Sequence, residues 1–227
     1  MYLAVAATKM EMQALERALG PSLCCERLVT GIGPMETAHR LTLYLTGTQK
    51  LFSGVVLFGV AGVYGKSGLD GPDLLDICLA EEEVLADFGI CFADGIEEFM
   101  APELATYNQF TLDAGLLARA EEALQRQDIT CCRGRFLTVQ CASGTKERGD
   151  MLAARFGGLC ENMEGAAVAR VCAAFDLPCL ELRSISNRVE DRDTGRWRLK
   201  EACARAGAAV ARVLEHLDQV QVREHTS

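Results

Sequence analysis

The chain has 227 residues, of which 49% are hydrophobic and 24% are charged, as is typical of a globular protein with a sizeable core. Its formal net charge of −9 would repel a phosphate backbone and argues against broad nucleic-acid binding. No stretch approaches the roughly 20 apolar residues that span a bilayer, so no membrane partner is expected. The short apolar start at residues 1–7 predicts a buried strand rather than a signal peptide.

The cysteine content points to a reducing compartment. There are 11 cysteines, an odd number without paired C-x-x-C spacing, and Cys78, Cys172 and Cys179 lie inside apolar runs, where a free thiol behaves as a small hydrophobe. We therefore expect a cytoplasmic protein. The three histidines lack the spacing of metal ligands, so no metal site is expected.

Apolar runs of strand length alternate with helical patterns along the chain. The expected strands cover residues 2–7, 55–58, 74–85, 135–142 and 179–185. The strand at 74–85 is expected to be followed by an irregular stretch that continues to about residue 104. The expected helices cover residues 9–19, a segment opened by Pro34, 111–126, a segment after Gly144, 163–175, and 193 or 194 to 217. This alternation predicts an α/β sheet covered on both faces. With no repeat or linker, we expect one domain over residues 1–227, with a frayed tail from about residue 218.

In sheets of this kind, ligands bind at the carboxyl ends of the strands. The loops to consider are therefore 8–11, 30–34, 59–62, 142–148, 160–164 and 184–197. Thr8 and Glu11 match the T-x-x-E capping box, which is the default structural interpretation of Glu11. The pair Gly31 and Gly33 lacks the third glycine of a dinucleotide fingerprint, because position 36 is Glu, and NAD binding is rejected.

Two of these loops concentrate polar groups. In loop 160–164, Asn162 can cap the following helix, and acids near it can face the helix dipole, so a structural role and a functional role are equally supported. Loop 184–197 carries several arginines beside Trp197, the sole tryptophan of the chain. That combination suits an anionic, aromatic ligand, although a solvated charged loop with a helix cap at Asp193 or Thr194 explains it as well.

The order of these features along the chain resembles that of a known protein family. Glu11, the glycine loop 59–62, Met163-Glu164 and Ser186-Asn187 resemble the nucleoside phosphorylase/nucleosidase superfamily, specifically its hydrolytic branch, over nearly the whole chain. The most specific segments are 161–169, 177–178 and 183–187. The run 187–193 together with Trp197 is more similar to the futalosine hydrolases than to the methylthioadenosine/S-adenosylhomocysteine nucleosidases.

The resemblance implies a three-layer αβα fold with a central mixed, twisted sheet, no cofactor, and a homo-oligomer, with a dimer favoured. It also implies that Glu11 activates the attacking water and that Glu164 grips the ribose hydroxyls, with Met163 packed against the sugar. The further substrate-binding positions expected are Ala61, Gly62, Ser143, Asn162, Ser186 and Arg192. A place in menaquinone biosynthesis follows if futalosine is the substrate.

Asn187 indicates which purine leaves. Adenine-specific members of the superfamily carry Asp at the matching position, whereas an amide can donate to a 6-oxo group and accept from protonated N7. An ionised Asp would face the 6-oxo oxygen lone pair to lone pair, and such a buried mismatch costs about 1–3 kcal/mol. The amide therefore favours hypoxanthine, the base of futalosine.

Several points stay open in the sequence. A benzoate on the 5′ side of the ribose needs a cation, and the candidates are Lys146, Arg148, Arg188, Arg192 and Arg196. Phe88 and Phe136 could stack on the purine, although core packing is the more common role of such residues. The first loop offers only Lys9 as a cation, and the Glu11 carboxylate beside it would repel phosphate, so water is favoured over phosphate as the nucleophile. The alternatives are a methylthioadenosine/S-adenosylhomocysteine nucleosidase, an inosine-type phosphorylase, and a catalytically silent nucleoside-binding domain.

Overall fold

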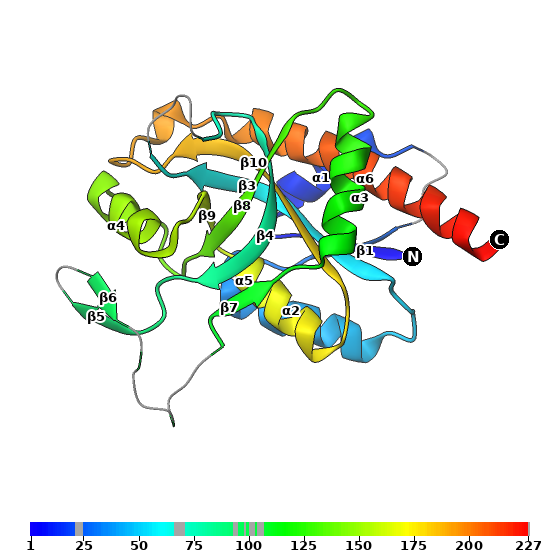
Figure 1. Cartoon of the computed structure of the whole chain (residues 1–227), viewed down its shortest axis with the longest axis horizontal. Helices are drawn as coiled ribbons and strands as arrows, with labels where there is room; N and C mark the ends of the chain where they lie inside the picture. Colours follow the sequence, from blue (N-terminus) through cyan, green and yellow to red (C-terminus); the bar gives the residue numbers. More distant parts are fainter. Residues whose placement is uncertain are drawn as a thin grey trace.

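The structure, a computed structural model, describes residues 1–20, 25–65, 71–92, 95–97, 99, 103 and 107–226. The strands of the main sheet are β1 (Tyr2–Ala6), β2 (Glu26–Val29), β3 (Gly54–Val63), β4 (Ile77–Leu85), β7 (Gln109–Thr111), β8 (Cys131–Thr138), β9 (Cys160–Asn162) and β10 (Cys179–Arg188). The helices are α1 (Lys9–Ala18), α2 (Pro34–Gly47), α3 (Ala114–Gln125), α4 (Lys146–Phe156), α5 (Gly165–Ala174) and α6 (Leu199–Thr226), with a 3₁₀ turn at Thr194–Arg196. A hairpin of β5 (Ile90–Phe92) and β6 (Gly95–Glu97) stands apart from the sheet (Figure 1).

The described strands form a mixed sheet that closes partly on itself. Strand β3 pairs with β10 along one edge, and the chain of pairings continues through β4, β8 and β9 back to the end of β3. Strands β1 and β2 extend from the first half of β3. The pairings β10–β4, β3–β9 and β4–β7 are antiparallel and the other pairings of this sheet are parallel, which confirms the predicted mixed, twisted sheet.

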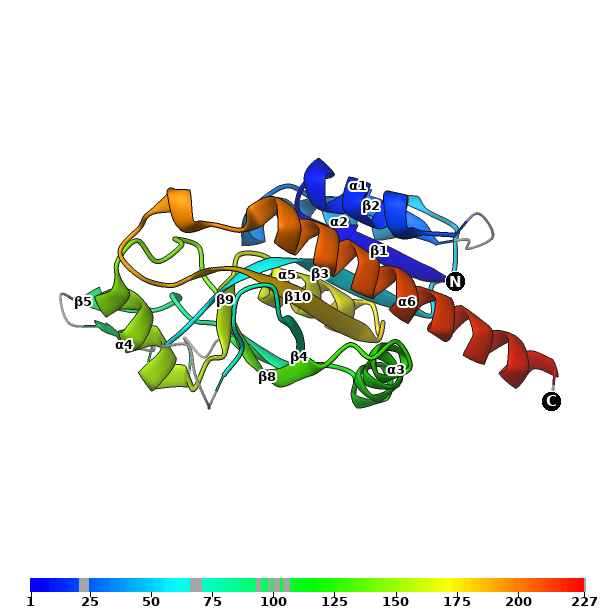
Figure 2. The ribbon, with the colours of Figure 1, turned by 90° about the horizontal axis from the view of Figure 1, so that it is seen from above.

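Alternating side chains build a separate core on each face of the sheet. In β1, Ala4 and Ala6 face the helices α1, α3 and α6, while Leu3 and Val5 face α2 and α5. The same alternation of period two occurs in β3, as expected of a strand buried on both faces. In Figure 1, α6 crosses above the sheet and α2 and α5 lie below it, and Figure 2 shows the same layers from above. The predicted three-layer arrangement is confirmed.

Several predicted boundaries are wrong. Strand β8 covers Cys131–Thr138 instead of 135–142, because Arg133 and Arg135, which argue against a strand in the sequence, form ion pairs with Glu81 and Glu82 of β4. Strand β9 occupies the start of the expected loop 160–164 and is too short to show alternation. The stretch predicted to be irregular contains the β5–β6 hairpin, and the rest of it lies largely outside the described residues.

The last helix also differs from the prediction. Asp193 accepts a hydrogen bond from the Gly195 amide at 3.0 Å and caps the 3₁₀ turn, so α6 begins only at Leu199. The helix continues to Thr226, past the expected end at residue 217. Whether its last turns fray stays a prediction.

The topology gathers the carboxyl ends of three parallel strands. Strand β1 leads into α1, which carries Glu11, and β3 and β10 end beside each other, with Gly62 opposite Asn187. The register of β10 shifts between Ile185 and Asn187, so Ser186 is the extra residue of a β-bulge. A bulge re-aims the side chains near it, and here it does so at the strand end where ligands are expected.

Candidate active site

A cavity of about 310 Å³ opens at these strand ends. It is lined by every residue that the sequence nominated as catalytic or substrate-binding, namely Glu11, Ala61, Gly62, Ser143, Asn162, Met163, Glu164, Ser186, Asn187 and Arg192. The structure therefore brings together positions that are up to 181 residues apart in sequence. Their individual roles stay predictions.

Glu11 is held at the cavity wall by the first turn of its own helix. The capping box predicted from T-x-x-E is present: Thr8 Oγ1 accepts from the Glu11 amide at 3.3 Å, and Glu11 Oε2 accepts from the Thr8 amide at 2.9 Å. The Thr8 hydroxyl also donates to Oε2 at 2.6 Å, while the Val60 amide donates to Oε1 at 3.1 Å. The capping role and a catalytic role are therefore compatible, because the cap fixes the carboxylate where the cavity begins.

The backbone of β3 can approach this carboxyl group only because residue 59 is glycine. A Cβ placed on Gly59 would collide with Glu11 Oε1 and would lie 2.8 Å from Arg183 Nη1. Burial raises the pKa of Glu11 above its ordinary value, and the charge of Glu164 adds to this, whereas the Thr8 hydrogen bond and the Arg183 charge oppose it. A carboxylate with a raised pKa is a stronger base near neutral pH than an exposed glutamate.

Glu164 lines the same cavity, just before α5, with 4% of its surface exposed. Its Oε1 accepts from the Gly33 amide at 3.1 Å and its Oε2 accepts from Arg183 Nη1 at 3.2 Å. Gly33 has φ of +94°, a backbone conformation in the left-handed region that favours glycine. The Gly31-Ile32-Gly33 loop, rejected as a nucleotide fingerprint, thus orients a carboxylate of the site.

Arg183 is the central cation of the site, and it was not among the site residues expected from the sequence. Its guanidinium is 1% exposed and donates to Glu164, to Glu181 Oε1 at 2.8 Å, to Asn162 Oδ1 at 3.2 Å and to the Val60 carbonyl at 3.3 Å. Burial by itself would lower the pKa of Arg183, but the carboxylates of Glu181, Glu164 and Glu11 raise it. A signal was available: Glu181 and Arg183 lie two residues apart, hence on the same face of a strand, with Leu180 and Leu182 as apolar neighbours, and buried charges in such a strand must be paired.

Asn162 organises the start of α5. Its Oδ1 accepts from the amides of Glu164 at 2.8 Å and Gly165 at 2.7 Å, and the Thr138 hydroxyl accepts from the Ala166 amide at 2.7 Å. These contacts satisfy amides that a helix leaves unpaired in its first turn. The N-cap residue of α5 is Glu164, which has no side-chain cap, so Asn162 is not the N-cap that the sequence suggested. From two residues earlier, its side chain accepts from the first amides and fixes Glu164 next to Arg183.

Two buried acids, Glu83 and Glu181, lie next to Asn162 and Arg183. Glu83 Oε1 accepts from Asn162 Nδ2 at 2.5 Å and its Oε2 accepts from the Thr138 hydroxyl at 2.7 Å. Burial, followed by the charge and the hydrogen bond of Glu181, raises the pKa of Glu83 well above its ordinary value. Glu181 Oε2 is buried and has no hydrogen-bond partner among the described residues. A proton on Glu83, which its raised pKa favours, would supply the donor that this oxygen requires.

Asn187 has its amide orientation fixed by the bulge. Its Nδ2 donates to the Arg188 carbonyl at 3.2 Å, and its Oδ1 accepts from the Ser186 hydroxyl at 2.8 Å. Since a carbonyl only accepts, the side-chain nitrogen must face Arg188. The amide retains one N–H and one lone pair for a ligand.

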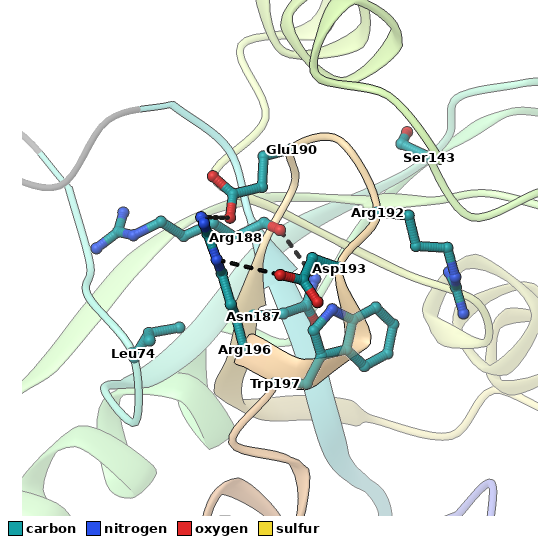
Figure 3. A pocket seen from close by; sticks show the side chains of 9 residues that line it. All are labelled: Leu74, Ser143, Asn187, Arg188, Glu190, Arg192, Asp193, Arg196 and Trp197. Carbon is teal, nitrogen blue, oxygen red and sulfur yellow. Dashed lines mark hydrogen bonds and ion pairs between the residues drawn. The ribbon is translucent and has the colours of Figure 1, made fainter.

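A second hollow of about 210 Å³ adjoins the first and shares Ser143, Asn187, Arg192 and Trp197 with it. Figure 3 shows Arg196 held by Glu190 and Asp193, whereas Arg192 lies on the other side of the Trp197 ring. The guanidinium carbon of Arg192 stands 4.8 Å from the centroid of that ring, a cation–π contact.

The five candidate cations for an anionic substituent are not equivalent. Arg188 pairs with Asp73, Lys146 pairs with Asp150, and Arg148 pairs with Asp87 at 3.1 Å. Arg196 pairs with two acids. Within the described part of the chain, Arg192 is the candidate that lines the main cavity and forms no ion pair with an acid.

The two phenylalanines suggested for stacking lie elsewhere. Phe136 is fully buried in the core between the sheet and α5, and Phe88 packs edge-on against Phe99 at 5.9 Å. Trp197 is the one aromatic side chain among the described residues of the cavity wall. Among the residues that the structure describes, no cluster of three or more His, Cys, Asp and Glu could hold a metal ion, and none of the described helices combines the length and hydropathy needed to cross a bilayer.

Residues 27–217 match the family described as the Phosphorylase superfamily. The chain belongs to this superfamily. The futalosine hydrolase of Thermus thermophilus is 38% identical to it over 192 residues, covering 82% of this chain and 80% of the relative. The resemblance to futalosine hydrolases and the prediction of an N-glycosyl hydrolase are thereby confirmed at the level of the family.

Two solved structures from Helicobacter pylori share the fold. A futalosine hydrolase has a TM-score of 0.80 at 22% identity, covering 94% of this chain and 97% of that chain. A mutant of the nucleosidase MTAN with 5′-methylthioadenosine in the active site has a TM-score of 0.81 at 21% identity, covering 96% and 98%. These likenesses confirm the predicted fold class.

Proposed function

We propose that the protein, acting as a single nucleosidase domain, hydrolyses the N-ribosidic bond of futalosine and releases hypoxanthine and dehypoxanthine futalosine. The observation that carries the proposal is the amide of Asn187, fixed in orientation at the wall of a cavity that also presents Glu11 and Glu164. The names of the most similar curated relatives support the same substrate.

Glu11 acts on the attacking water. Its carboxylate is held by Thr8 and Val60 at the cavity wall, and its raised pKa suits a general base that accepts a proton as the water adds to the anomeric carbon. Arg183 forms an ion pair with Glu164 at 3.2 Å, and its positive charge also acts on Glu11, so it offsets the repulsion between the two carboxylates.

Glu164 holds the ribose. A carboxylate that accepts from two hydroxyl groups makes charge-assisted hydrogen bonds, and these strengthen as positive charge develops on the sugar ring. The Gly33 amide and Arg183 each occupy one lone pair of the Glu164 oxygens, which leaves further acceptor capacity for the hydroxyls. Met163 lines the same wall and offers an apolar surface to the sugar.

Asn187 assists the leaving base. The free N–H donates to the 6-oxo group. The remaining lone pair of Oδ1 accepts from N7 once that atom has taken a proton from solvent, which balances the proton that Glu11 removes from the attacking water. Stabilising the neutral, N7-protonated hypoxanthine lowers the barrier to cleavage of the glycosidic bond. Ser186 supports this arrangement because its hydroxyl donates to Oδ1.

Arg192 binds the benzoate of futalosine. It lines the cavity, rests on Trp197 and has no acid partner among the described residues, whereas the other four candidates are ion-paired. Replacing Arg192 with Ala should raise KM for futalosine several-fold with a smaller effect on kcat. Equal KM values for the variant and the wild type would contradict this assignment.

Water rather than phosphate is the nucleophile in this proposal. The wall presents the carboxylates of Glu11, Glu161 and Glu164, and the buried cation beside them, Arg183, is already bound to acids. These carboxylates would repel a phosphate dianion, and Arg183 is not available to bind it.

The discriminating experiment uses the purified protein with futalosine, inosine and methylthioadenosine, each with and without phosphate. The proposal predicts release of hypoxanthine from futalosine without phosphate and without ribose 1-phosphate. A methylthioadenosine/S-adenosylhomocysteine nucleosidase would release adenine faster, an inosine-type phosphorylase would require phosphate, and a silent binding domain would release no base.

The cellular location, the pathway and the oligomeric state of the enzyme are also proposals. The ten described cysteines are free thiols, which supports the expected cytoplasmic location, and the reaction would belong to menaquinone biosynthesis. The apolar side chains of Ile32 and Met35 are 60% and 78% exposed, which supports a homo-oligomer with a dimer favoured. Light scattering in solution tests that state.

A further inference from the structure

We propose that Glu161 accepts the N1–H of the departing purine and thereby selects 6-oxopurine nucleosides over their 6-amino analogues. This inference rests on the proposed function and concerns the specificity of the same site. Glu161 is the first residue of the segment 161–169 and was not among the site residues expected from the sequence.

Glu161 is built into the cavity wall from β9. It pairs with Gly62 of β3 and with Leu137 of β8, and its side chain points away from its neighbour Asn162, which faces Arg183. Only 8% of Glu161 is exposed, and it lines the main cavity. A buried acid at a cavity wall requires partners that explain its burial.

Two donors orient the carboxylate. Oε1 accepts from the Ser143 amide at 2.9 Å, and Oε2 accepts from the Tyr64 hydroxyl at 3.1 Å. Burial, followed by the charge of Glu161, raises the pKa of Tyr64, so this phenol remains a donor. Within the described residues Glu161 forms no ion pair, and each of its oxygens retains acceptor capacity toward the cavity.

Glu161 and Asn187 flank the same glycine. A Cβ placed on Gly62 would lie 3.0 Å from Asn187 Nδ2 and 3.6 Å from Glu161 Cγ. The two side chains therefore approach a ligand over Gly62 from neighbouring positions, one from β10 and one from β9. An amide that engages N7 and the 6-oxo group leaves N1, the ring atom next to C6 on the other side, to the neighbouring acceptor.

The chemistry of N1 separates the two classes of purine. A 6-oxopurine carries a hydrogen on N1, whereas a 6-aminopurine has a lone pair there. A carboxylate only accepts, so it complements the first and repels the second. Sites that hydrogen-bond a polar group of the substrate reject analogues that lack it more strongly than apolar pockets do.

A structural role for Glu161 makes a different prediction. If the carboxylate serves only to hold the Ser143 amide and the Tyr64 hydroxyl, its loss disturbs the wall for every purine nucleoside equally. A change in the ratio of two substrates that differ only at C6 therefore distinguishes recognition of the base from maintenance of the wall.

The test is Glu161→Gln, assayed with futalosine and with its 6-amino analogue. Gln keeps the size of the side chain and an acceptor for the Ser143 amide, and its NH₂ group presents a donor where the carboxylate presented an acceptor. We expect kcat/KM for futalosine to fall by about ten- to hundredfold while kcat/KM for the amino analogue is unchanged or rises. Glu147→Gln, at an exposed position of α4, should leave both values unchanged.

Equal losses for both substrates, or no loss for either, would overturn the inference. Equilibrium binding of free hypoxanthine and free adenine gives the same comparison without turnover: the Gln variant should lose affinity for hypoxanthine relative to adenine. Failure of the wild type to cleave futalosine would remove the proposed function, whereas an unchanged ratio in an active Glu161→Gln variant would remove only the role of Glu161.

Discussion

At the scale of single residues, the site depends on polar side chains whose orientation is fixed by the backbone. Asn187 is held between the Ser186 hydroxyl and the Arg188 carbonyl, and Glu11 is held by Thr8 and the Val60 amide. Such preorganised groups need no rearrangement when charge develops in the transition state. The chemistry of the site is therefore sensitive to replacements that keep the shape of a side chain but change its donors.

Asn187→Asp is the sharpest of these replacements. At neutral pH an ionised Asp would face both the Arg188 carbonyl and the 6-oxo group of the base, and a buried mismatch costs about 1–3 kcal/mol. We expect kcat/KM for hypoxanthine release from futalosine to fall by about ten- to hundredfold. Asn187→Ala, which removes the group without adding repulsion, is the matched comparison, and an Asp variant as active as the wild type would contradict the role of Asn187.

Glu11 determines the acid limb of the pH profile. A general base works only when it is deprotonated, and the pKa of Glu11 is raised by burial, so kcat/KM should fall as the pH drops through a value above the ordinary 4.5 of a glutamate. Glu11→Gln should lower kcat by about 10²- to 10⁴-fold while futalosine still binds. A pH profile without an acid limb above that ordinary value would contradict this role.

At the scale of elements, the first turns of helices couple local stability to the site. The capping box of α1 positions Glu11, and the Asn162 side chain, which accepts from the Glu164 and Gly165 amides before α5, positions Glu164. The capping box of α1 was visible in the sequence, since T-x-x-E is a local pattern, whereas the helix boundary that makes Glu164 rather than Asn162 the N-cap of α5 was not. The strands that complete the site were harder to predict, because β9 is three residues long and β8 carries arginines whose partners lie on β4.

Thr8→Ala tests the coupling in α1. Loss of an N-cap costs about 1 kcal/mol of stability, and because the Thr8 hydrogen bond lowers the pKa of Glu11, its removal should move the acid limb of kcat/KM to higher pH. Thr145→Ala removes the equivalent cap of α4 and should lose similar stability without moving the limb. If the acid limb of kcat/KM lay at the same pH in the wild type and in Thr8→Ala, the Thr8 cap would have no influence on the catalytic carboxylate.

At the scale of the whole molecule, strands far apart in sequence close the sheet around buried charges. Glu83, Glu181, Arg183 and Asn162 come from three strands and meet only because β3, β10, β4, β8 and β9 pair in a ring. The sequence predicted the alternation of strands and helices and the nominated residues of the cavity. It could not predict this network, since composition and periodicity do not specify which face of one strand meets another across a closed sheet.

Glu83→Gln tests the buried acid pair through global stability. The pKa of Glu83 is raised in the fold relative to the ordinary 4.5, so the native state binds this proton more tightly than the unfolded chain, and stability from it is lost as the pH rises toward the raised pKa. Gln does not ionise. The free energy of unfolding of the variant should therefore improve relative to the wild type with increasing pH, by up to about 1.4 kcal/mol per pH unit.

Urea denaturation over a series of pH values measures this difference. Glu82→Gln, on the same strand but paired with Arg135 near the surface, should keep the pH dependence of the wild type. Parallel curves for Glu83→Gln and the wild type would show that Glu83 carries no tightly bound proton in the native state.

The central claim is that the Asn187 amide binds the 6-oxo edge of the base, while Glu164 binds the ribose and Glu11 activates the water. A crystal structure of Glu11→Gln with intact futalosine tests it most directly. We predict Asn187 Nδ2 at about 2.7–3.2 Å from the 6-oxo oxygen, with Glu164 on the ribose hydroxyls. A base bound away from Asn187, or a ribose that does not contact Glu164, would contradict the account.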